Sequence, residues 1–180
     1  AWAGQLADVP LLARKIASVR VPLSLMEKID KVVDEHGNVR ENASRGLSEI
    51  TGRMREIRRH IETILEGYFS SPETRQFIQE KSVTFKDDRY VIPVKQNFKG
   101  KIPGIVHAYS GSGQTLFVEP FSITEKNNEL KLLQKDREKE IERILVALTA
   151  DIGTHAADLN RLQEALVDVD ILLAKRRLME

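Results

Sequence analysis

The sequence contains no cysteine. This absence excludes a disulfide-stapled scaffold, a cysteine-ligated zinc site and a thiol nucleophile, and it is compatible with a reducing cytoplasm, where we expect the protein. Aromatic residues make up only 6% of the 180 residues, whereas 31% are charged. Ordinary globular domains are roughly 25% charged. High charge with few aromatics favours long helices that keep one face in solvent.

Neither a long apolar run nor an excess of one sign of charge is present. No apolar run approaches the ~20 residues of a membrane span, so we expect no membrane partner. Lys and Arg total 28 against 27 Asp and Glu, a net charge of +1. No overall attraction to nucleic acid follows, and any basic site must be local. The chain opens on Ala1-Trp2-Ala3-Gly4 with neither Met nor a signal peptide; we expect a piece of a longer protein.

Apolar residues make up 41% of the chain. Within residues 1–80 most of them recur at helical spacing. Leu6–Val19 reads as a short amphipathic helix, and Pro22 opens a second one. Val32–Val39 then carries β-branched residues at both ends of a Gly-Asn turn signal, which predicts a helix end followed by a small hairpin or loop.

A longer helix is predicted from an N-cap at Asn42 or Ser44. Apolar residues recur alternately three and four apart at Leu47, Ile50, Met54, Ile57, Ile61, Ile64 and Tyr68. About 27 residues of this heptad pattern give a coiled-coil-like arm of roughly 40 Å. Glu residues three or four positions from the basic run 53–60 favour a solvated face with intrahelical pairs. Pro72 ends the arm and starts a short helix through Gln79.

Residues 81–121 have a different pattern, typical of strands. Four β-rich runs, separated by turn-like segments, cover Ser82–Phe85, Tyr90–Lys95, Gly104–Tyr109 and Thr115–Glu119. They predict a four-stranded antiparallel meander. In a meander the first turn and the third turn, Ser110–Gln114, lie together at the distal end. Lys99 and Lys101, in the middle turn, then lie nearer the helices.

After Pro120 the spacing is helical to the end of the chain. The apolar stripe Leu130, Leu133, Ile141, Ile144, Leu148 and Ile152 predicts a return helix that pairs antiparallel with the outgoing arm. Gly153 favours a bend or break. The predicted fold is therefore mainly α with a small inserted β module: a helical base and outgoing helix in 1–80, the β module in 81–121, and the return helix or helices in 122–180.

No catalytic motif is present. The chain lacks GxxxxGK[ST], HExxH and GxSxG, and Gly111-Ser112-Gly113 lacks the strand-to-helix context of a phosphate loop. His107 reads as a packed or surface strand residue, and Glu119 has no neighbouring acid or base in the sequence. We therefore expect no catalytic, cofactor-binding or metal-binding residue in this chain.

A nucleic-acid surface has better support. Residues 81–121 hold six Lys or Arg and three acidic residues, a local charge of +3, whereas the remainder sums to −2. Tyr90, Phe98 and Tyr109 are interleaved with these charges, as on surfaces that bind phosphate backbones. A solvated face of unrelated purpose would have the same composition. The candidate binding residues are Lys86, Arg89, Lys95, Lys99, Lys101, Ser110, Ser112 and Gln114.

Several short motifs carry a family resemblance. They are Arg89–Lys95 (RYVIPVK), Val106-His107, Ser112–Pro120 (SGQTLFVEP), Asn127–Leu130 (NNEL) and Glu140–Leu145 (EIERIL). The pattern resembles the bacterial MutS-II proteins, recombination-suppressing paralogues of the mismatch-repair protein MutS, over nearly all of the chain. It departs from the family at Asp88, where Gly is common.

The resemblance implies a non-catalytic fragment with lever helices that carry a clamp, which closes around branched or duplex DNA in a homodimer. It places ATP and Mg in a C-terminal ATPase domain, and a small Smr nuclease domain further on, both outside this chain. Family members are also associated with collided ribosomes. The alternative is therefore a dimerisation arm, or an arm that docks on the ribosome or its rRNA.

Overall fold

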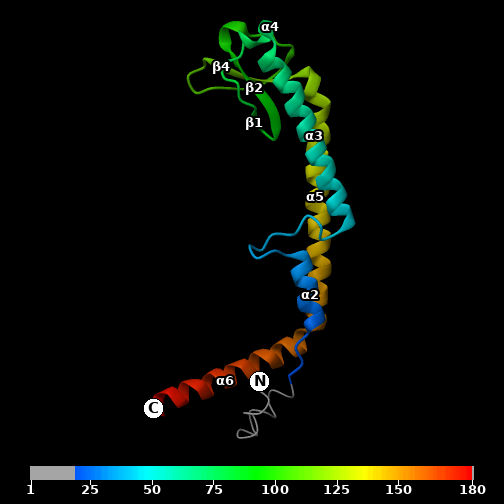
Figure 1. The fold of residues 1–180 in the computed structure, drawn as a ribbon, viewed down its shortest axis with the longest axis vertical. Helices are drawn as coiled ribbons and strands as arrows, with labels where there is room; N and C mark the ends of the chain where they lie inside the picture. The colour runs from blue at the N-terminus through cyan, green and yellow to red at the C-terminus, as the bar shows by residue number, and fades with distance from the viewer. Residues whose placement is uncertain (1–18, 180) are drawn as a thin grey trace. The chain divides into compact units, whose positions relative to one another are not determined.

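The computed structural model describes residues 19–179. These residues are mostly helical with one small antiparallel sheet, which confirms the predicted mainly-α class (Figure 1). Ser44–Ile141 forms one compact unit, and Ala1–Ala43 with Glu142–Glu180 forms the other. The helix predicted at Leu6–Val19 lies outside the described residues except for its last one.

The unit outside Ser44–Ile141 contains α2, Leu23–Val32, which begins directly after Pro22 as predicted. Val33 and Val39 then form an antiparallel bridge, and Gly37 in the intervening turn has a φ of +83°. The predicted helix end and small hairpin are confirmed.

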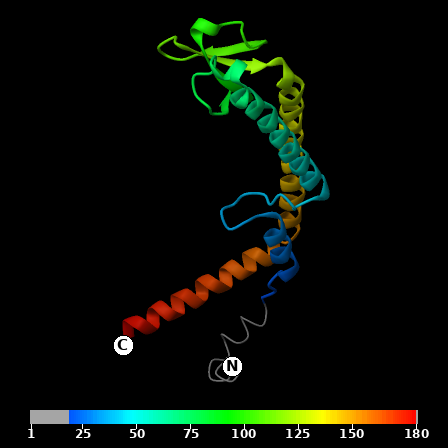
Figure 2. The ribbon, with the colours of Figure 1, turned by 45° about the horizontal axis from the view of Figure 1, so that its top comes forward.

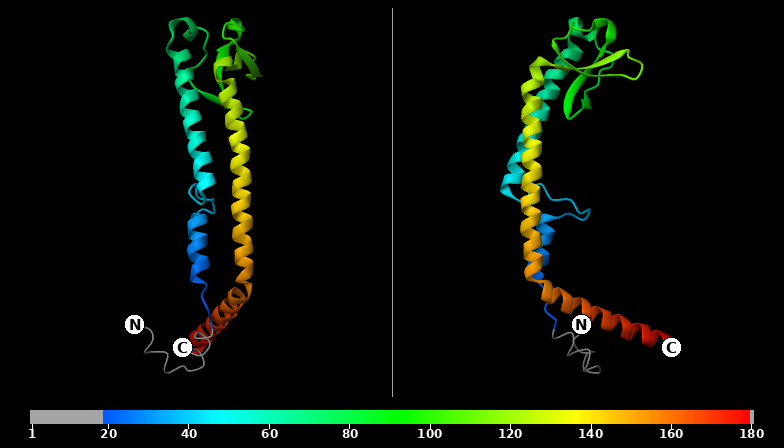
Figure 3. Two further views of the ribbon diagram at one scale, coloured as in Figure 1. Left: turned by 90° about the vertical axis from the view of Figure 1, so that its right-hand side faces the viewer. Right: turned by 180° about the vertical axis from the view of Figure 1, so that it is seen from behind.

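The same unit contains the junction of the two C-terminal helices, α5 (Phe121–Thr154) and α6 (Ala156–Met179). The helix is interrupted at His155, whose ring Nδ1 lies 3.0 Å from the carbonyl oxygen of Asp151. Figure 3 shows the two helices meeting at an angle there. The interruption predicted from Gly153 is confirmed, two residues further along.

The outgoing helix is α3, Arg45–Ser70. Its N-cap is Ser44, whose Oγ accepts a hydrogen bond of 3.0 Å from the backbone N–H of Leu47. The buried stripe largely follows the predicted seam and consists of Leu47, Thr51, Met54, Ile57, Ile61 and Leu65. Thr51 and Leu65 take the fully buried places beside Ile50 and Ile64, which are only half-buried.

Helix α3 and the first part of α5 lie side by side and antiparallel, as predicted (Figure 3, left). Three polar contacts join them in reverse sequence order: Ser44 Oγ to Glu140 Oε1 at 2.7 Å, Arg53 Nη2 to Glu129 Oε1 at 3.0 Å, and Tyr68 OH to Ser122 Oγ at 3.1 Å. Arg53 also pairs with Glu56 at 2.9 Å, one of the intrahelical pairs expected of the basic run.

The short helix α4 spans only Pro72–Arg75, so the predicted extension to Gln79 is wrong. Beyond it, Ile78 bridges Val94 in an antiparallel pair, and the backbone N–H of Lys95 donates to Phe77. Strand-like pairing with the sheet therefore replaces the last helical turn.

The four strands lie where the sequence predicts them, within two residues at each end: β1 Thr84–Lys86, β2 Arg89–Lys95, β3 Gly104–Tyr109 and β4 Thr115–Pro120. Their order in the sheet is β1-β2-β4-β3, and each neighbouring pair is antiparallel. The predicted meander is wrong, because β2 pairs with β4 and not with β3.

Two features explain this order. The segment after β2 is a short 3₁₀ helix, Gln96–Phe98, followed by a connection anchored by buried Ile102, and not a tight turn. The strands with the longest buried runs, β2 and β4, occupy the middle, while β3 exposes Ile105 and Tyr109 at the edge. Buried strands read as continuous apolar runs, and edge strands tolerate exposure.

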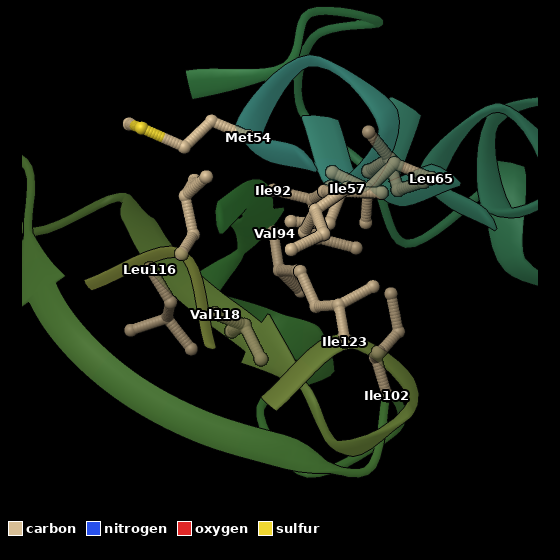
Figure 4. Close-up of a cluster of buried hydrophobic side chains, with 12 residues drawn as sticks. Met54, Ile57, Leu65, Ile92, Val94, Ile102, Leu116, Val118 and Ile123 are labelled. Atoms are coloured by element: carbon tan, nitrogen blue, oxygen red, sulfur yellow. The ribbon is translucent and has the colours of Figure 1, made fainter. Parts of the chain in front are cut away.

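One hydrophobic core joins the sheet to the helix pair (Figure 4). Helix α3 contributes Met54, Ile57, Ile61 and Leu65; β2 and β4 contribute Ile92, Val94, Leu116 and Val118; α5 contributes Ile123 and Leu130. The β module is thus stabilised by the helices that flank it in sequence, as expected for about 41 residues that could hardly bury a core alone.

Candidate nucleic-acid interface

The turn between β1 and β2, here called the hairpin end, contains Lys86 and Arg89. Asp87 and Asp88 form its two central residues, with φ of 48° and 62°. Positive φ at both central positions is what a type I′ hairpin turn requires. The turn is therefore tight even though Asp88 stands where Gly is common. The ammonium of Lys86 lies over the Phe117 ring, 5.2 Å from its centroid.

A buried carboxylate, that of Glu119 on β4, contacts Arg89 of the hairpin end. The Glu119 side chain is 0% exposed. Its Oε1 accepts from Arg89 Nη1 at 2.7 Å and from Asn127 Nδ2 at 2.9 Å, and its Oε2 lies 2.5 Å from His107 Nε2. Burying a carboxylate is costly unless it is paired and hydrogen-bonded. This network, contributed by β2, β3, β4 and α5, meets that cost.

The network also satisfies the backbone of β2. Asn127 Oδ1 accepts from the N–H of Tyr90 and Asn127 Nδ2 donates to its carbonyl, both at 3.0 Å. Continuing the β2–β4 register places Pro120 opposite Tyr90, and because proline has no N–H to donate, the side chain of Asn127 on α5 pairs with the Tyr90 backbone instead. Burial raises the pKa of the Tyr90 hydroxyl.

The structure corrects two expectations about these residues. Arg89 is only 20% exposed, and its second nitrogen donates to Asn128 Oδ1 at 2.6 Å, so its donors are already engaged within the fold. Glu119 does have a neighbouring base, because a β-bulge between Val106 and Ala108 brings His107 to it. Arg89, His107 and Glu119 come from three different strands, so no periodic pattern in the sequence indicates that they meet.

The opposite end of the sheet, here called the loop end, is formed by the β3–β4 turn Ser110–Gln114. Ser110 Oγ accepts from the backbone N–H of Thr115 at 3.1 Å, and Gly113 has a φ of +70°. The backbone N–H of Gln96 donates to Gln114 at 3.0 Å, which fixes the end of β2 beside this loop. Figure 2 and Figure 3 (right) show the loop projecting away from the helix pair.

Two lysines join the loop end. Lys99 Nζ lies 3.5 Å from the hydroxyl of Tyr109, a ring that is 54% exposed. Lys95 donates from Nζ to the carbonyl of Gln76 at 3.0 Å. Lys99 therefore lies beside the end of β3, where the third turn begins. Lys101 is exposed on the connection between β2 and β3.

Seven of the eight predicted binding residues fall into two groups at opposite ends of the sheet, so the predicted common distal end for the first and third turns is wrong. Lys86 and Arg89 lie at the hairpin end, whereas Lys95, Lys99, Ser110, Ser112 and Gln114 lie at the loop end. Lys101 lies on the connection between β2 and β3. The strand order causes this separation, because β2 runs antiparallel to β4 and ends beside its start.

Two further findings concern the described part of the chain. None of its helices is both long enough and apolar enough to cross a bilayer. Residues 19–179 also contain no group of three or more His, Asp or Glu side chains placed to hold a metal ion.

The chain is thus a protein of the helical-arm class: a pair of long helices carries a small β module, and lysines and polar residues gather at one end of that module. No family model matches the chain. It is 38% identical over 169 residues to the Endonuclease MutS2 of Pelotomaculum thermopropionicum, covering 93% of this chain and 21% of that protein. It is also 38% identical over 170 residues to the Endonuclease MutS2 of Halalkalibacterium halodurans, covering 94% of this chain and 22% of that protein. It is likewise 38% identical over 176 residues to the Endonuclease MutS2 of Geobacillus thermodenitrificans, covering 98% of this chain and 21% of that protein.

The chain is therefore homologous to one segment of the MutS2 proteins, and the resemblance carried by its motifs is confirmed. It spans about a fifth of the length of these relatives. Several of the motif residues, Arg89, His107, Glu119 and Asn127, are the ones that build the buried network.

Proposed function

We propose that this chain is a non-catalytic lever and clamp segment that binds branched or duplex DNA through phosphate-backbone contacts. The observation that carries the proposal is the gathering of Lys95, Lys99, exposed Tyr109 and the polar loop at one end of the sheet. Ammonium groups, hydroxyls and loop backbone N–H groups all donate to phosphate oxygens without reading bases.

In the longer MutS2 proteins, the proposal extends to a homodimer whose two clamps enclose DNA. An ATPase domain outside this chain, using ATP and Mg, would drive opening and closing and thereby suppress homologous recombination. Nuclease activity would belong to the separate Smr domain. These roles rest on the family resemblance and the relatives' name.

The test is a salt titration of DNA affinity with the double variant Lys95→Gln/Lys99→Gln, which removes both lysines of the loop end. Each lost phosphate contact should reduce the slope of log K against log salt by about 0.9 on duplex DNA, so the double variant should lose about 1.8. Lys31→Gln, an exposed lysine at the end of α2, is the matched control and should leave the slope unchanged. Wild-type affinity and slope in the double variant would contradict the proposal. A four-way junction and a blunt duplex, measured in parallel, separate branched from duplex binding.

A second candidate function, an interaction arm for dimerisation or ribosome docking, is favoured by α6. This helix exposes many large apolar side chains, at 46–87% of their surface: Leu166, Val167, Ile171, Leu172, Leu173 and Leu178. Contiguous exposed apolar residues mark surfaces that meet a partner.

Sedimentation velocity over a wide concentration range tests this alternative. Self-association that Leu172→Glu abolishes would support a dimerisation arm, and co-sedimentation with collided ribosomes that the same variant abolishes would support docking. A monomer that does not co-sediment would exclude the alternative for this chain.

A further inference from the structure

A groove lies between the β1–β2 hairpin and the helix pair, within the unit Ser44–Ile141. Its volume is about 340 Å³. The hairpin contributes Phe85 and Asp88 and α3 contributes Arg58; α5 contributes Leu130, Lys131, Gln134, Lys135 and Glu138. Figure 3 (right) shows the hairpin turning back along the helices, away from the loop end. This groove is thus separate from the loop end to which DNA backbone contacts are assigned.

Phe85 is an exposed aromatic ring on the side of the sheet that faces the helices. It lies directly opposite Tyr90, and residues opposite one another in an antiparallel pair share a face. Tyr90 in turn shares its face with Ile92, a member of the core, because side chains alternate along a strand. The hairpin extends past that core, so Phe85 remains 55% exposed. Its ring is held by an edge-to-face contact with Tyr90, with centroids 5.2 Å apart.

The opposite wall carries cations at a regular spacing. Lys131 and Lys135 are one helical turn apart on α5, and both are exposed. Among the described residues neither has a carboxylate within salt-bridge distance. Arg58 faces them from α3, so three cations line the groove with two carboxylates, Asp88 and Glu138. Buried Leu130 adds apolar surface.

We propose that this groove binds an unpaired nucleotide, with its base stacked on Phe85 and its flanking phosphates held by Lys131 and Lys135. Sites for single-stranded nucleic acid combine an aromatic platform with a cationic track in this way. A paired base inside a duplex has both faces covered by its neighbours and offers none to Phe85. The inference rests on the proposed nucleic-acid function and adds a preference for unpaired strands.

The experiment compares a forked duplex, with single-stranded arms, against a blunt duplex of the same paired sequence. A 2-aminopurine in the arm reports stacking through its fluorescence. Phe85→Leu keeps an apolar side chain but removes the aromatic face, and should weaken fork binding about tenfold while leaving blunt-duplex binding within about twofold. Phe121→Leu, which replaces a phenylalanine of similar exposure outside the groove, is the matched control and should bind both like wild type.

A second variant tests the cations. Lys131→Gln/Lys135→Gln should reduce the salt slope for the single-stranded arm by about 1.4, since each contact to a single strand contributes about 0.7. Thermal unfolding of both variants verifies that these exposed substitutions leave the fold intact. Arms made of DNA in one set and RNA in another tell which strand the groove takes, and a Phe85 effect in either set supports the site.

The outcomes separate the two proposals. Wild-type fork binding by Phe85→Leu, or an equal loss on fork and duplex, overturns the groove and leaves the loop-end proposal standing. A wild-type chain that binds neither fork nor duplex overturns both.

Discussion

Replacing Arg89 by Ala removes one side of the buried ion pair with Glu119. The substitution separates two roles for Arg89, because the sequence alone favours a DNA contact and the structure shows a residue that holds β2 to β4 and α5. The freed Oε1 of Glu119 would keep the hydrogen bond from Asn127, and Oε2 would keep its contact with His107.

The magnitude follows from burial. Removing one partner of a buried pair typically costs about 3–5 kcal/mol, since the remaining charge is left uncompensated. Arg89 is 20% exposed and Glu119 retains two partners, so water and the remaining network recover part of that cost. We therefore expect a loss of about 2–3 kcal/mol in the free energy of unfolding. With a urea m-value of about 1–3 kcal/mol per molar, the midpoint should fall by about 1 M or more.

Urea unfolding followed by circular dichroism measures this shift. Lys86→Ala is the matched control from the same turn, and should cost less than about 1 kcal/mol because it removes only an exposed cation–π contact. Arg89→Lys should lie between the two, as an ammonium cannot reach both Glu119 and Asn128 in the way a guanidinium fork does. A loss in Arg89→Ala no larger than in Lys86→Ala would refute the structural role. Wild-type stability together with weakened DNA binding in Arg89→Ala would indicate that Arg89 contacts DNA instead.

Three further predictions concern backbone geometry and one carboxyl group. Gly104→Ala should destabilise the chain by about 1–3 kcal/mol in the same unfolding assay, because an added Cβ would lie 2.3 Å from the carbonyl oxygen of Glu119; unfolding like wild type would show that β3 can shift. Asp88→Gly should stabilise it by about 0.5–1 kcal/mol, since Gly accepts the φ of 62° without strain, and a lower midpoint would contradict this. NMR titration of Asp34 should give a pKa below the ordinary aspartate value of 3.8, chiefly because its carboxylate accepts the backbone N–H of Asn38 at 2.8 Å. Because the folded-state pKa is depressed, this contribution to stability is present above the unfolded value and lost as pH falls through the folded one; an ordinary midpoint would refute it.

Local patterns in the sequence predict the helices and strands well, because spacing and capping act over a few residues. The seam of α3, the opening of α2 at Pro22 and the break near Gly153 are all visible in the chain alone. The end of α4 is not, since Ile78 leaves the helix to pair with Val94, a partner far along the chain.

The strand order shows the same limit at the level of the sheet. Short turn-like separators favour neighbours in sequence, and they predict a meander. The order β1-β2-β4-β3 follows instead from which strands bury best and from a connection long enough to cross the sheet. That order divides the predicted binding residues between two ends and places Lys99 beside Tyr109.

The mainly-α class, the position of the β module, the local positive charge and the relationship to MutS2 proteins can all be read from the amino-acid sequence, because each depends on composition, on periodicity or on short motifs. The roles of Arg89 and Glu119, and the groove formed by Phe85 with Lys131 and Lys135, become visible only in the folded chain. These relations join residues thirty or more positions apart. The register of the strands and the antiparallel packing of two helices bring them together, and no local pattern encodes that.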